Sequence, residues 1–137
     1  IKGLRLELLD NRMIDWNGIE VIGVNDVQSL QKQQTLQSVL QSLPLDTAKP
    51  KILMYHTPVN WDVARKHNIQ LMLSGHTHNG QVFPFTLLVR AAFKYVKGLY
   101  QEEGKFLHVT PGTGTWGPPM RLGSRNQITT IELTPHS

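Results

Sequence analysis

The chain has 137 residues, of which 39% are hydrophobic, with a formal net charge of +4 and no cysteine. This length suits one globular domain, residues 1–137, that buries about two thirds of the surface of its unfolded chain. The absence of cysteine excludes disulfides, iron–sulfur clusters and thiolate zinc sites. No apolar run reaches the roughly 20 residues of a membrane-spanning helix. The basic residues are scattered and lack interleaved aromatic side chains, so no nucleic-acid partner is expected.

The opening third of the chain is typical of an antiparallel meander. Apolar and charged residues alternate over residues 4–8, which predicts a strand with one buried face. Residues 12–16 can return as a second strand. Asn17-Gly18 then predicts a tight hairpin turn, because both residue types tolerate positive φ. Residues 19–24 complete the meander as a third strand.

A helix is expected next, with Asn25-Asp26 as its cap and Pro44 as its end. Its apolar positions recur close to helical spacing, and they are Val27, Leu30, Leu36, Val39, Leu40 and Leu43.

The middle of the chain predicts one βαβ unit over residues 51–74. A continuous apolar strand over residues 52–55 is followed by a short helix over residues 61–67 and a second buried strand over residues 71–73. The two strands should therefore be parallel neighbours. Open parallel sheets bind ligands outside the carboxyl ends of their strands, so the residues that follow these two strands are candidates for a site.

Residues 86–99 suit an amphipathic helix that carries Arg90, Lys94 and Lys97 at helical spacing. A plain surface helix and a helix resting on anionic lipid are both compatible with this pattern. Two further strands are expected over residues 106–109 and 127–133, separated by a loop rich in glycine and proline. The overall expectation is a mixed α/β fold.

Three histidines lie at the ends of the two βαβ strands. His56 follows the first strand, and His76 and His78 follow the second. Adjacent strands lie about 4.8 Å apart, so the three rings can converge on one site. In an extended His-X-His segment both rings face the same side, and neutral imidazole suits Zn, Mn, Fe or Co. For the remaining histidines, His67, His108 and His136, we prefer surface or hydrogen-bonded core positions.

Three segments resemble motifs of the calcineurin-like metallophosphoesterases. They are Tyr55-His56-Thr57-Pro58, Ser74-Gly75-His76-Thr77-His78-Asn79-Gly80-Gln81, and Gly114-Thr115-Trp116-Gly117-Pro118-Pro119-Met120-Arg121-Leu122-Gly123. The first two resemble the last two metal motifs of the family. The third resembles a signature of a bacterial subgroup of predicted phosphohydrolases, some relatives of which are membrane-associated.

The resemblance implies an α/β sandwich of two sheets flanked by helices that holds two divalent metal ions, Mn, Zn or Fe. By resemblance, His56 and His76 would bind one ion and His78 the other. Two ions held together would acidify a bridging water and stabilise the oxyanions of an in-line displacement. The implied function is metal-dependent hydrolysis of a phosphomonoester, phosphodiester or pyrophosphate.

The family's upstream motifs, Asp-X-His, Gly-Asp-X-X-Asp and Gly-Asn-His-Asp/Glu, are absent from this chain. Asp10, Asp15 and Asp26 stand in no matching context and receive no role. We therefore expect this chain to be the C-terminal half of a catalytic domain. It should be inactive by itself, and its expected partner is the missing N-terminal half. The start at Ile1, close to a predicted strand, suggests a processed or truncated product.

Candidate substrate contacts are Asn79, Trp116, Arg121 and Arg125. An arginine can hold a phosphate bidentately, and a tryptophan can stack on a substrate ring. Solvated arginines and a tryptophan that packs the loop are the alternatives. The expected partner is a phosphorylated small molecule or a lipid-linked substrate, in the cytoplasm or at a membrane surface.

Two other functions remain open. A mononuclear zinc hydrolase would need only His56, His76, His78 and one water. A non-catalytic interaction or lipid-surface module would keep the scaffold alone. Metal stoichiometry separates the three hypotheses, and the sequence does not determine the oligomeric state.

Overall fold

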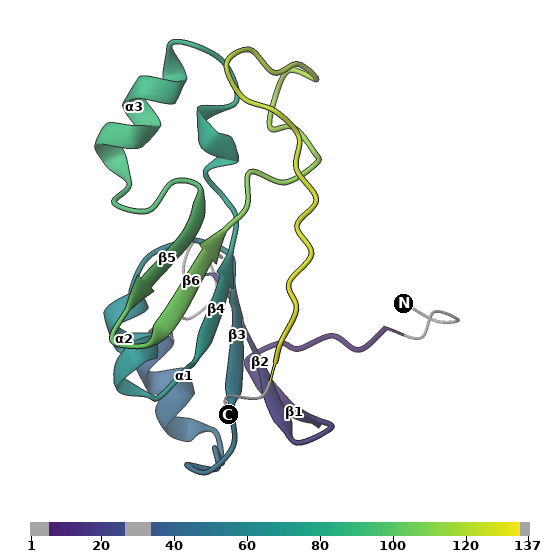
Figure 1. Ribbon diagram of the computed structural model, residues 1–137, viewed down its shortest axis with the longest axis vertical. Coiled ribbons are helices and arrows are strands. Elements are labelled where there is room, and N and C mark those ends of the chain that lie inside the picture. Colours follow the sequence, from purple (N-terminus) through teal and green to yellow (C-terminus); the bar gives the residue numbers. More distant parts are fainter. Residues whose placement is uncertain (1–5, 27–33, 135–137) are drawn as a thin grey trace.

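The computed structural model describes residues 6–26 and 34–134, and it shows one mixed six-stranded sheet with helices (Figure 1). The strand order is β1-β2-β3-β4-β6-β5. The bounds are β1 Arg12–Trp16, β2 Ile19–Val24, β3 Lys51–Tyr55, β4 Leu71–Ser74, β5 Gly98–Glu102 and β6 Lys105–Val109. The expected mixed α/β fold is confirmed.

The predicted hairpin is present, but the predicted meander is wrong. β1 and β2 pair antiparallel, and Asn17 and Gly18 both adopt positive φ between them, at 53° and 86°. Residues 6–9 form no strand, and the rest of the strand expected over residues 4–8 lies outside the described residues. β2 instead pairs parallel with β3, with Glu20 opposite Lys51 and Val24 opposite Tyr55. The hairpin therefore joins the parallel part of the sheet.

The βαβ unit is confirmed. β3, helix α2 (Trp61–Lys66) and β4 follow one another, and β3 pairs parallel with β4. β4 pairs parallel with β6, and β5 adds an antiparallel edge. Three adjacent strands, β2, β3 and β4, consequently end at the same edge of the sheet.

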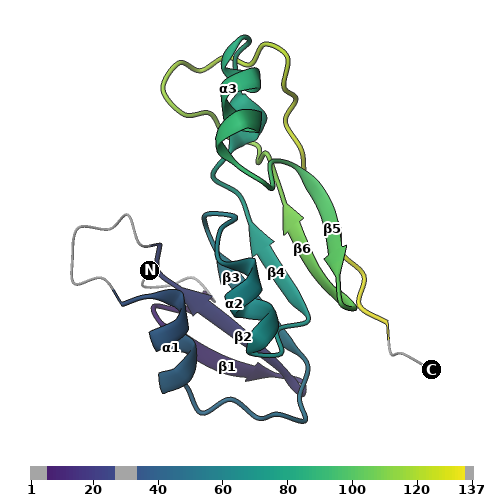
Figure 2. The same cartoon turned by 90° about the vertical axis from the view of Figure 1, so that its left-hand side faces the viewer.

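The core lies between the sheet and two helices on one of its faces. Helix α1 (Leu36–Ser42) and α2 both cover this face (Figure 2). One row of paired positions crosses the sheet beneath them and is inaccessible to solvent: Ile22, Leu53, Met72 and Leu107. α1 adds Leu36, Val39 and Leu40, and α2 adds Trp61 and Ala64.

Both remaining predicted helices differ from expectation. The N-cap of α1 is Thr35, whose hydroxyl accepts a hydrogen bond from the Ser38 amide at 3.1 Å, so Asn25-Asp26 does not cap it. Residues 27–33 of the expected helix lie outside the described residues. Helix α3 is Phe85–Ala92 and ends where Phe93 becomes extended. The chain then turns through Gly98, whose φ of 106° suits glycine, into β5, so no helix continues to Leu99.

The strand expected over residues 127–133 is absent. This segment starts with a hydrogen bond from the Gln127 amide to the Gly112 carbonyl at 3.1 Å and then runs back on the side of the sheet away from α1 and α2 (Figure 1). The segment pairs with neither edge strand of the described sheet, β1 or β5, so its alternating pattern forms no strand. Among the described residues, no helix is long and apolar enough to cross a bilayer.

Candidate metal centre

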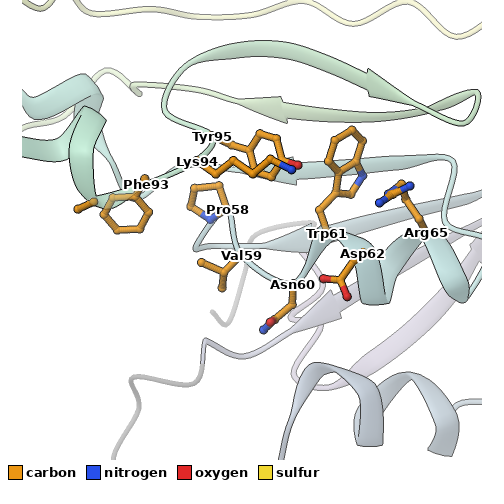
Figure 3. A pocket seen from close by; sticks show the side chains of 10 residues that line it. Pro58, Val59, Asn60, Trp61, Asp62, Arg65, Phe93, Lys94 and Tyr95 are labelled. Carbon is orange, nitrogen blue, oxygen red and sulfur yellow. The ribbon is translucent and has the colours of Figure 1, made fainter.

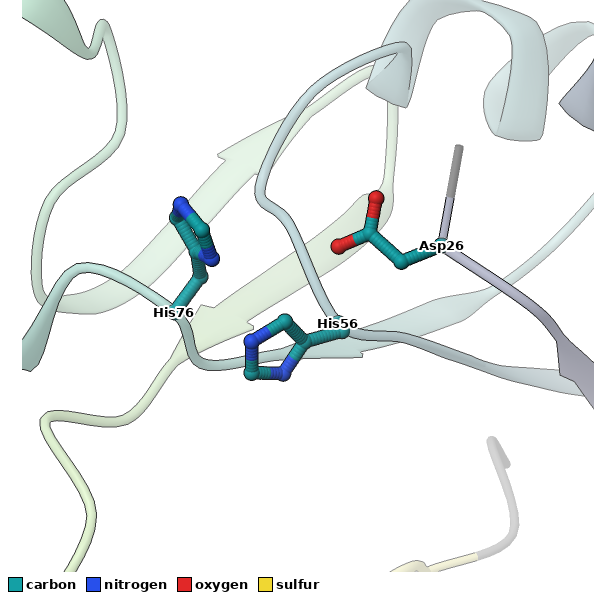
Figure 4. Close-up of side chains that lie close together, drawn as sticks. All are labelled: Asp26, His56 and His76. Carbon is teal, nitrogen blue, oxygen red and sulfur yellow. The ribbon is translucent and has the colours of Figure 1, made fainter. Parts of the chain in front are cut away.

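A cluster of metal-ligating side chains lies at the carboxyl ends of β2, β3 and β4. His56 follows the last residue of β3 directly, while Asp26 and His76 each come two residues after the ends of β2 and β4. Each of the three offers a ligand atom that lies within 4.8 Å of the other two (Figure 4). The parallel sheet therefore collects one carboxylate and two imidazoles from three separate segments.

Backbone contacts hold the two histidine segments together. The Gly75 amide donates to the His56 carbonyl at 2.9 Å, and the Ser74 hydroxyl donates to the Tyr55 carbonyl at 2.7 Å. The rings of His56 and His76 meet edge to face with centroids 5.1 Å apart. The chain reverses at His76, which has φ 66°, and this left-handed conformation is strained for a residue other than glycine.

The segment His76-Thr77-His78 is not extended, contrary to expectation. Thr77 has φ −70° and ψ −22°, and His78 has φ 47° at the start of a 3₁₀ turn, η1 (His78–Gly80). His78 lies outside the group formed by Asp26 and the other two histidines. Its neighbour is Arg121, whose Nη2 lies 3.5 Å from Nδ1 of His78. The structure thus separates His78 from the closest pair of rings.

Burial and neighbouring charge lower the pKa of two of these histidines, His76 and His78. Burial lowers the pKa of His76, and His56 lowers it further, against an opposing effect of Asp26. Burial lowers the pKa of His78, and Arg121 is the next largest cause, followed by His56 and His76. A lowered pKa favours the neutral ring at neutral pH, in which one nitrogen carries no proton and is free to bind metal.

Asp26 is the member of the cluster that sequence reasoning missed. Its Oδ2 accepts a hydrogen bond from the hydroxyl of Thr57, the buried residue that follows His56. The predicted antiparallel meander leaves no place for Asp26 at the end of a strand parallel to β3, which is where the structure puts it. The apolar run of residues 21–24, followed directly by Asn25-Asp26, is the sequence signal of a strand end at this point.

The predicted substrate contacts lie on or beside the loop that follows β6. Arg121 donates to the carbonyls of His78 at 3.1 Å and Pro111 at 2.8 Å, and to the Ser124 hydroxyl at 3.0 Å. Arg121 therefore ties the loop to η1. Gln81 holds the loop a second time, through both the amide and the carbonyl of Trp116.

The side chains of Trp116 and Arg125 are exposed, and Asn79 lies in η1 next to His78. Contact of these residues and of Arg121 with a substrate stays a prediction.

A hollow of about 430 Å³ lies between the loop after β3 and the segment after α3 (Figure 3). Trp61 and Tyr95 contact edge to face, with ring centroids 5.2 Å apart. Phe93 also lines this hollow, and its ring centroid lies 5.6 Å from that of His76. The hollow therefore adjoins the cluster and offers aromatic surface to a bound molecule.

The donor set fits a divalent metal ion. Imidazole nitrogen and carboxylate oxygen together suit Zn, Mn or Fe, and ligating carboxylates are commonly oriented by a hydrogen bond such as that from Thr57.

The chain was compared with known proteins. No family model and no solved structure matches it. A protein of Helicobacter pylori strain J99 named "Uncharacterized metallophosphoesterase" is 37% identical over 135 residues, which cover 96% of this chain and 36% of the relative. The chain belongs to the metallophosphoesterase family.

Two further relatives are similar to this chain. The "Transmembrane protein with metallophosphoesterase domain" of Bos taurus is 39% identical over 127 residues, covering 87% of this chain and 28% of that protein. "Phosphodiesterase YaeI" of Escherichia coli K12 is 34% identical over 91 residues, which cover 61% of this chain and 32% of that protein. The chain spans only about a third of the length of its bacterial relatives. Membership of this family implies divalent metal cofactors.

Proposed function

We propose that this chain supplies one wall of a dinuclear metal centre that hydrolyses a phosphomonoester, phosphodiester or pyrophosphate. The observation that carries the proposal is the convergence of Asp26, His56 and His76 at the carboxyl ends of three parallel strands. Family membership supports the reaction class, and the choice among the three phosphate bonds rests on the resemblance alone.

Each ligand has a separate part in this proposal. His56 and His76, with Asp26, hold one divalent ion, because their ligand atoms share one space. His78 holds the second ion, which agrees with its position outside that group. Mn, Zn or Fe suits both positions. Such ions supply polarisation of the phosphoryl oxygens and activation of a water.

The residues around the ligands keep them in position. Arg121 holds the backbone carbonyl of His78 and thereby fixes the 3₁₀ turn that presents its ring. Thr57 orients the carboxylate of Asp26. In this proposal Asn79, Trp116 and Arg125 contact the substrate, which is a phosphorylated small molecule or a lipid-linked phosphoester.

The proposed centre needs further ligands. Three imidazoles and one carboxylate do not both bridge two cations and balance their charge, so a second wall supplies the remaining carboxylates. In the relatives, about two thirds of the length lies outside the match. We propose that this region forms the second sheet, and that it packs on the sheet face opposite the helices, where Met54 is 41% exposed. Residues 1–137 alone are then inactive.

The mononuclear alternative is less well supported. It requires His56, His76 and His78 around one ion, and His78 is not among the ligand atoms that lie within 4.8 Å of one another. Hydrolysis by residues 1–137 alone would favour this alternative over ours.

A phosphodiester hydrolysis assay tests the proposal. The full-length gene product, loaded with Mn²⁺, is expected to hydrolyse bis(p-nitrophenyl) phosphate. His56→Asn or His78→Asn should lower kcat at least about a hundredfold, because each removes a ligand. His67→Asn, at the end of α2, is the matched control and should leave kcat unchanged. Full activity in the His56 variant would contradict the proposed role.

A further inference from the structure

Helix α3 turns its apolar side away from the protein. Thr86 is the buried residue of the helix and packs against η1. The approach is close: a Cβ atom added at Gly80 would lie only 2.3 Å from the Cα of Thr86. At 100° per residue, Leu88 and Ala91 lie opposite Thr86. Phe85, Leu87 and Leu88 are 61%, 57% and 61% exposed. An amphipathic helix normally buries its apolar side, so an apolar side that is exposed indicates a binding surface.

Neighbouring residues extend the apolar surface. The Phe83 amide donates to the Leu122 carbonyl at 2.8 Å, and both side chains are 56% exposed. Trp116 lies in the same loop as Leu122 and is 78% exposed, and its backbone is hydrogen-bonded to the side chain of Gln81. In Figures 1 and 2, α3 and this loop together form one end of the molecule, which we call the α3 tip (residues 81–97 and 113–125).

The α3 tip is also uniformly basic. The sequence has no aspartate or glutamate over residues 63–101 or 104–131. The tip carries Arg90, Lys94, Lys97, Arg121 and Arg125. The first three line a hollow of about 440 Å³, which Asn79 also borders. Of these three, Lys94 has an acidic neighbour, Glu102, at 3.6 Å.

We propose that the α3 tip docks on the surface of an anionic lipid bilayer. Phe85, Leu87 and Leu88 enter the headgroup region, while the basic side chains at the edge of the helix contact lipid phosphates. Exposed leucine and phenylalanine flanked by lysine and arginine are the features of helices that lie in the membrane interface. Trp116 suits the same depth, because an indole ring prefers the boundary between lipid and water.

The charge of the tip favours lipid over a second copy of the chain. A symmetric dimer through α3 would bring the same basic residues of two chains face to face, with no acidic residue of the tip to offset them. An anionic bilayer supplies both the apolar layer and the opposite charge. The docking stands without the proposed metal chemistry, but it would place Asn79, next to His78, within reach of lipid headgroups.

Vesicle sedimentation tests the docking. Residues 1–137 are mixed with sucrose-loaded vesicles of phosphatidylcholine, or of phosphatidylcholine with phosphatidylglycerol. We expect the chain to sediment with the anionic vesicles, less at high salt, and hardly at all with the neutral ones. Leu87→Ser/Leu88→Ser should lower the partition coefficient at least about tenfold, because it removes the apolar contact. Arg90→Glu/Lys97→Glu should lower it at least as much.

Two matched variants serve as controls. Leu8→Ser changes a leucine that is 71% exposed in the segment before β1, and this segment lies far from α3 in both views. Lys66→Glu reverses an exposed lysine on α2. Both should sediment like the wild type. A blue shift of tryptophan emission on binding, lost in Trp116→Phe, would place the loop at the interface. Circular dichroism checks that each variant is folded.

Other outcomes overturn the proposal. The same partition coefficient in all variants, or no sedimentation with anionic vesicles, would show that α3 does not dock on lipid. Self-association that disappears in Leu87→Ser/Leu88→Ser, seen by light scattering without vesicles, would assign the surface to a second copy. Neither result bears on phosphodiester hydrolysis, so the two proposals fail separately.

Discussion

Asp26 shows how one residue changes the chemistry of the candidate centre. Two imidazoles alone leave a divalent ion with its full charge, and a carboxylate within 4.8 Å of both offsets part of it. The histidine pattern could be predicted from the sequence because the three histidines lie close behind the ends of two apolar strands. Asp26 was harder to predict: the apolar run before it marks a strand end, but its place beside the histidines depends on the parallel pairing of β2 with β3, which no local pattern specifies.

Removing the charge of Asp26 should weaken metal binding. We predict that Asp26→Asn raises the dissociation constant of this chain for Co²⁺ about 10- to 100-fold, measured by titration calorimetry. Asp62→Asn, an exposed aspartate of α2 outside the cluster, is the control and should bind like the wild type. An unchanged constant in the Asp26 variant would remove Asp26 from the centre.

A buried ion pair fixes the register of β2 against β3. Glu20 and Lys51 face each other in the sheet with Nζ and Oε2 3.7 Å apart, and their side chains are 3% and 2% exposed. Lys51 also donates to the carbonyls of Asp46 and Lys49, and Glu20 accepts from the Asp46 amide at 2.9 Å.

We predict that Lys51→Met lowers the free energy of unfolding by about 3–5 kcal/mol, because it leaves the Glu20 carboxylate buried without its cation. Urea titration measures this loss. Lys49→Met breaks the exposed pair with Asp15 and should change stability little. Glu20→Met/Lys51→Met should recover much of the loss. Equal, small losses in the two lysine variants would show that the buried pair does not hold the strands.

His108 should make stability depend on pH. Burial in β6 lowers its pKa, so between that value and the ordinary value near 6.5 the unfolded chain binds more protons than the folded chain. The stability that the folded chain gains by burying neutral His108 is therefore complete above about pH 6.5, and it is lost as the pH falls toward the lowered pKa. We predict that His108→Gln reduces the shift of the urea midpoint between about pH 7 and pH 5, while His67→Gln does not. An unreduced shift in the His108 variant would contradict this.

At the scale of elements, Gly80 allows helix α3 to pack closely against η1. It adopts φ 72°, and a Cβ there would lie 2.3 Å from the Cα of Thr86. The helix can therefore approach η1 only where a glycine stands.

We predict that Gly80→Ala costs more stability than Gly104→Ala. Both glycines have nearly the same positive φ, 72° and 70°, but a Cβ at Gly104 meets nothing within 4 Å. The conformational strain of placing alanine at positive φ, about 1–3 kcal/mol, is therefore common to both variants. Any further loss of stability in Gly80→Ala measures the cost of displacing α3. Thermal unfolding compares the two, and equal losses would show that α3 does not depend on this contact.

Among the elements, those with local signals could be predicted from the sequence. The Asn17-Gly18 hairpin and the βαβ unit have their own turn residues and spacing, and both are present. The end of α3 had no such signal, because residues 93–97 continue the helical pattern and only the turn at Gly98 and the pairing of β5 with β6 stop it. The tail over residues 127–133 alternates like a strand, but strand formation requires a partner.

At the scale of the molecule, the sheet is covered on one face and carries the candidate metal centre at one edge. α1 and α2 bury one side, and the side with Met54 remains accessible. The same edge that holds Asp26, His56 and His76 adjoins the basic α3 tip. The two proposals therefore place phosphoester chemistry next to a lipid surface.

Metal content tests the central claim most directly. The full-length gene product is purified, dialysed against Mn²⁺ and then metal-free buffer, and analysed by plasma mass spectrometry. We predict two ions per chain, with both His56→Ala and His78→Ala lowering the count and His67→Ala leaving it at two. One ion that needs all three of His56, His76 and His78 would favour a mononuclear hydrolase, and no bound ion would contradict a metal centre at the ends of these strands.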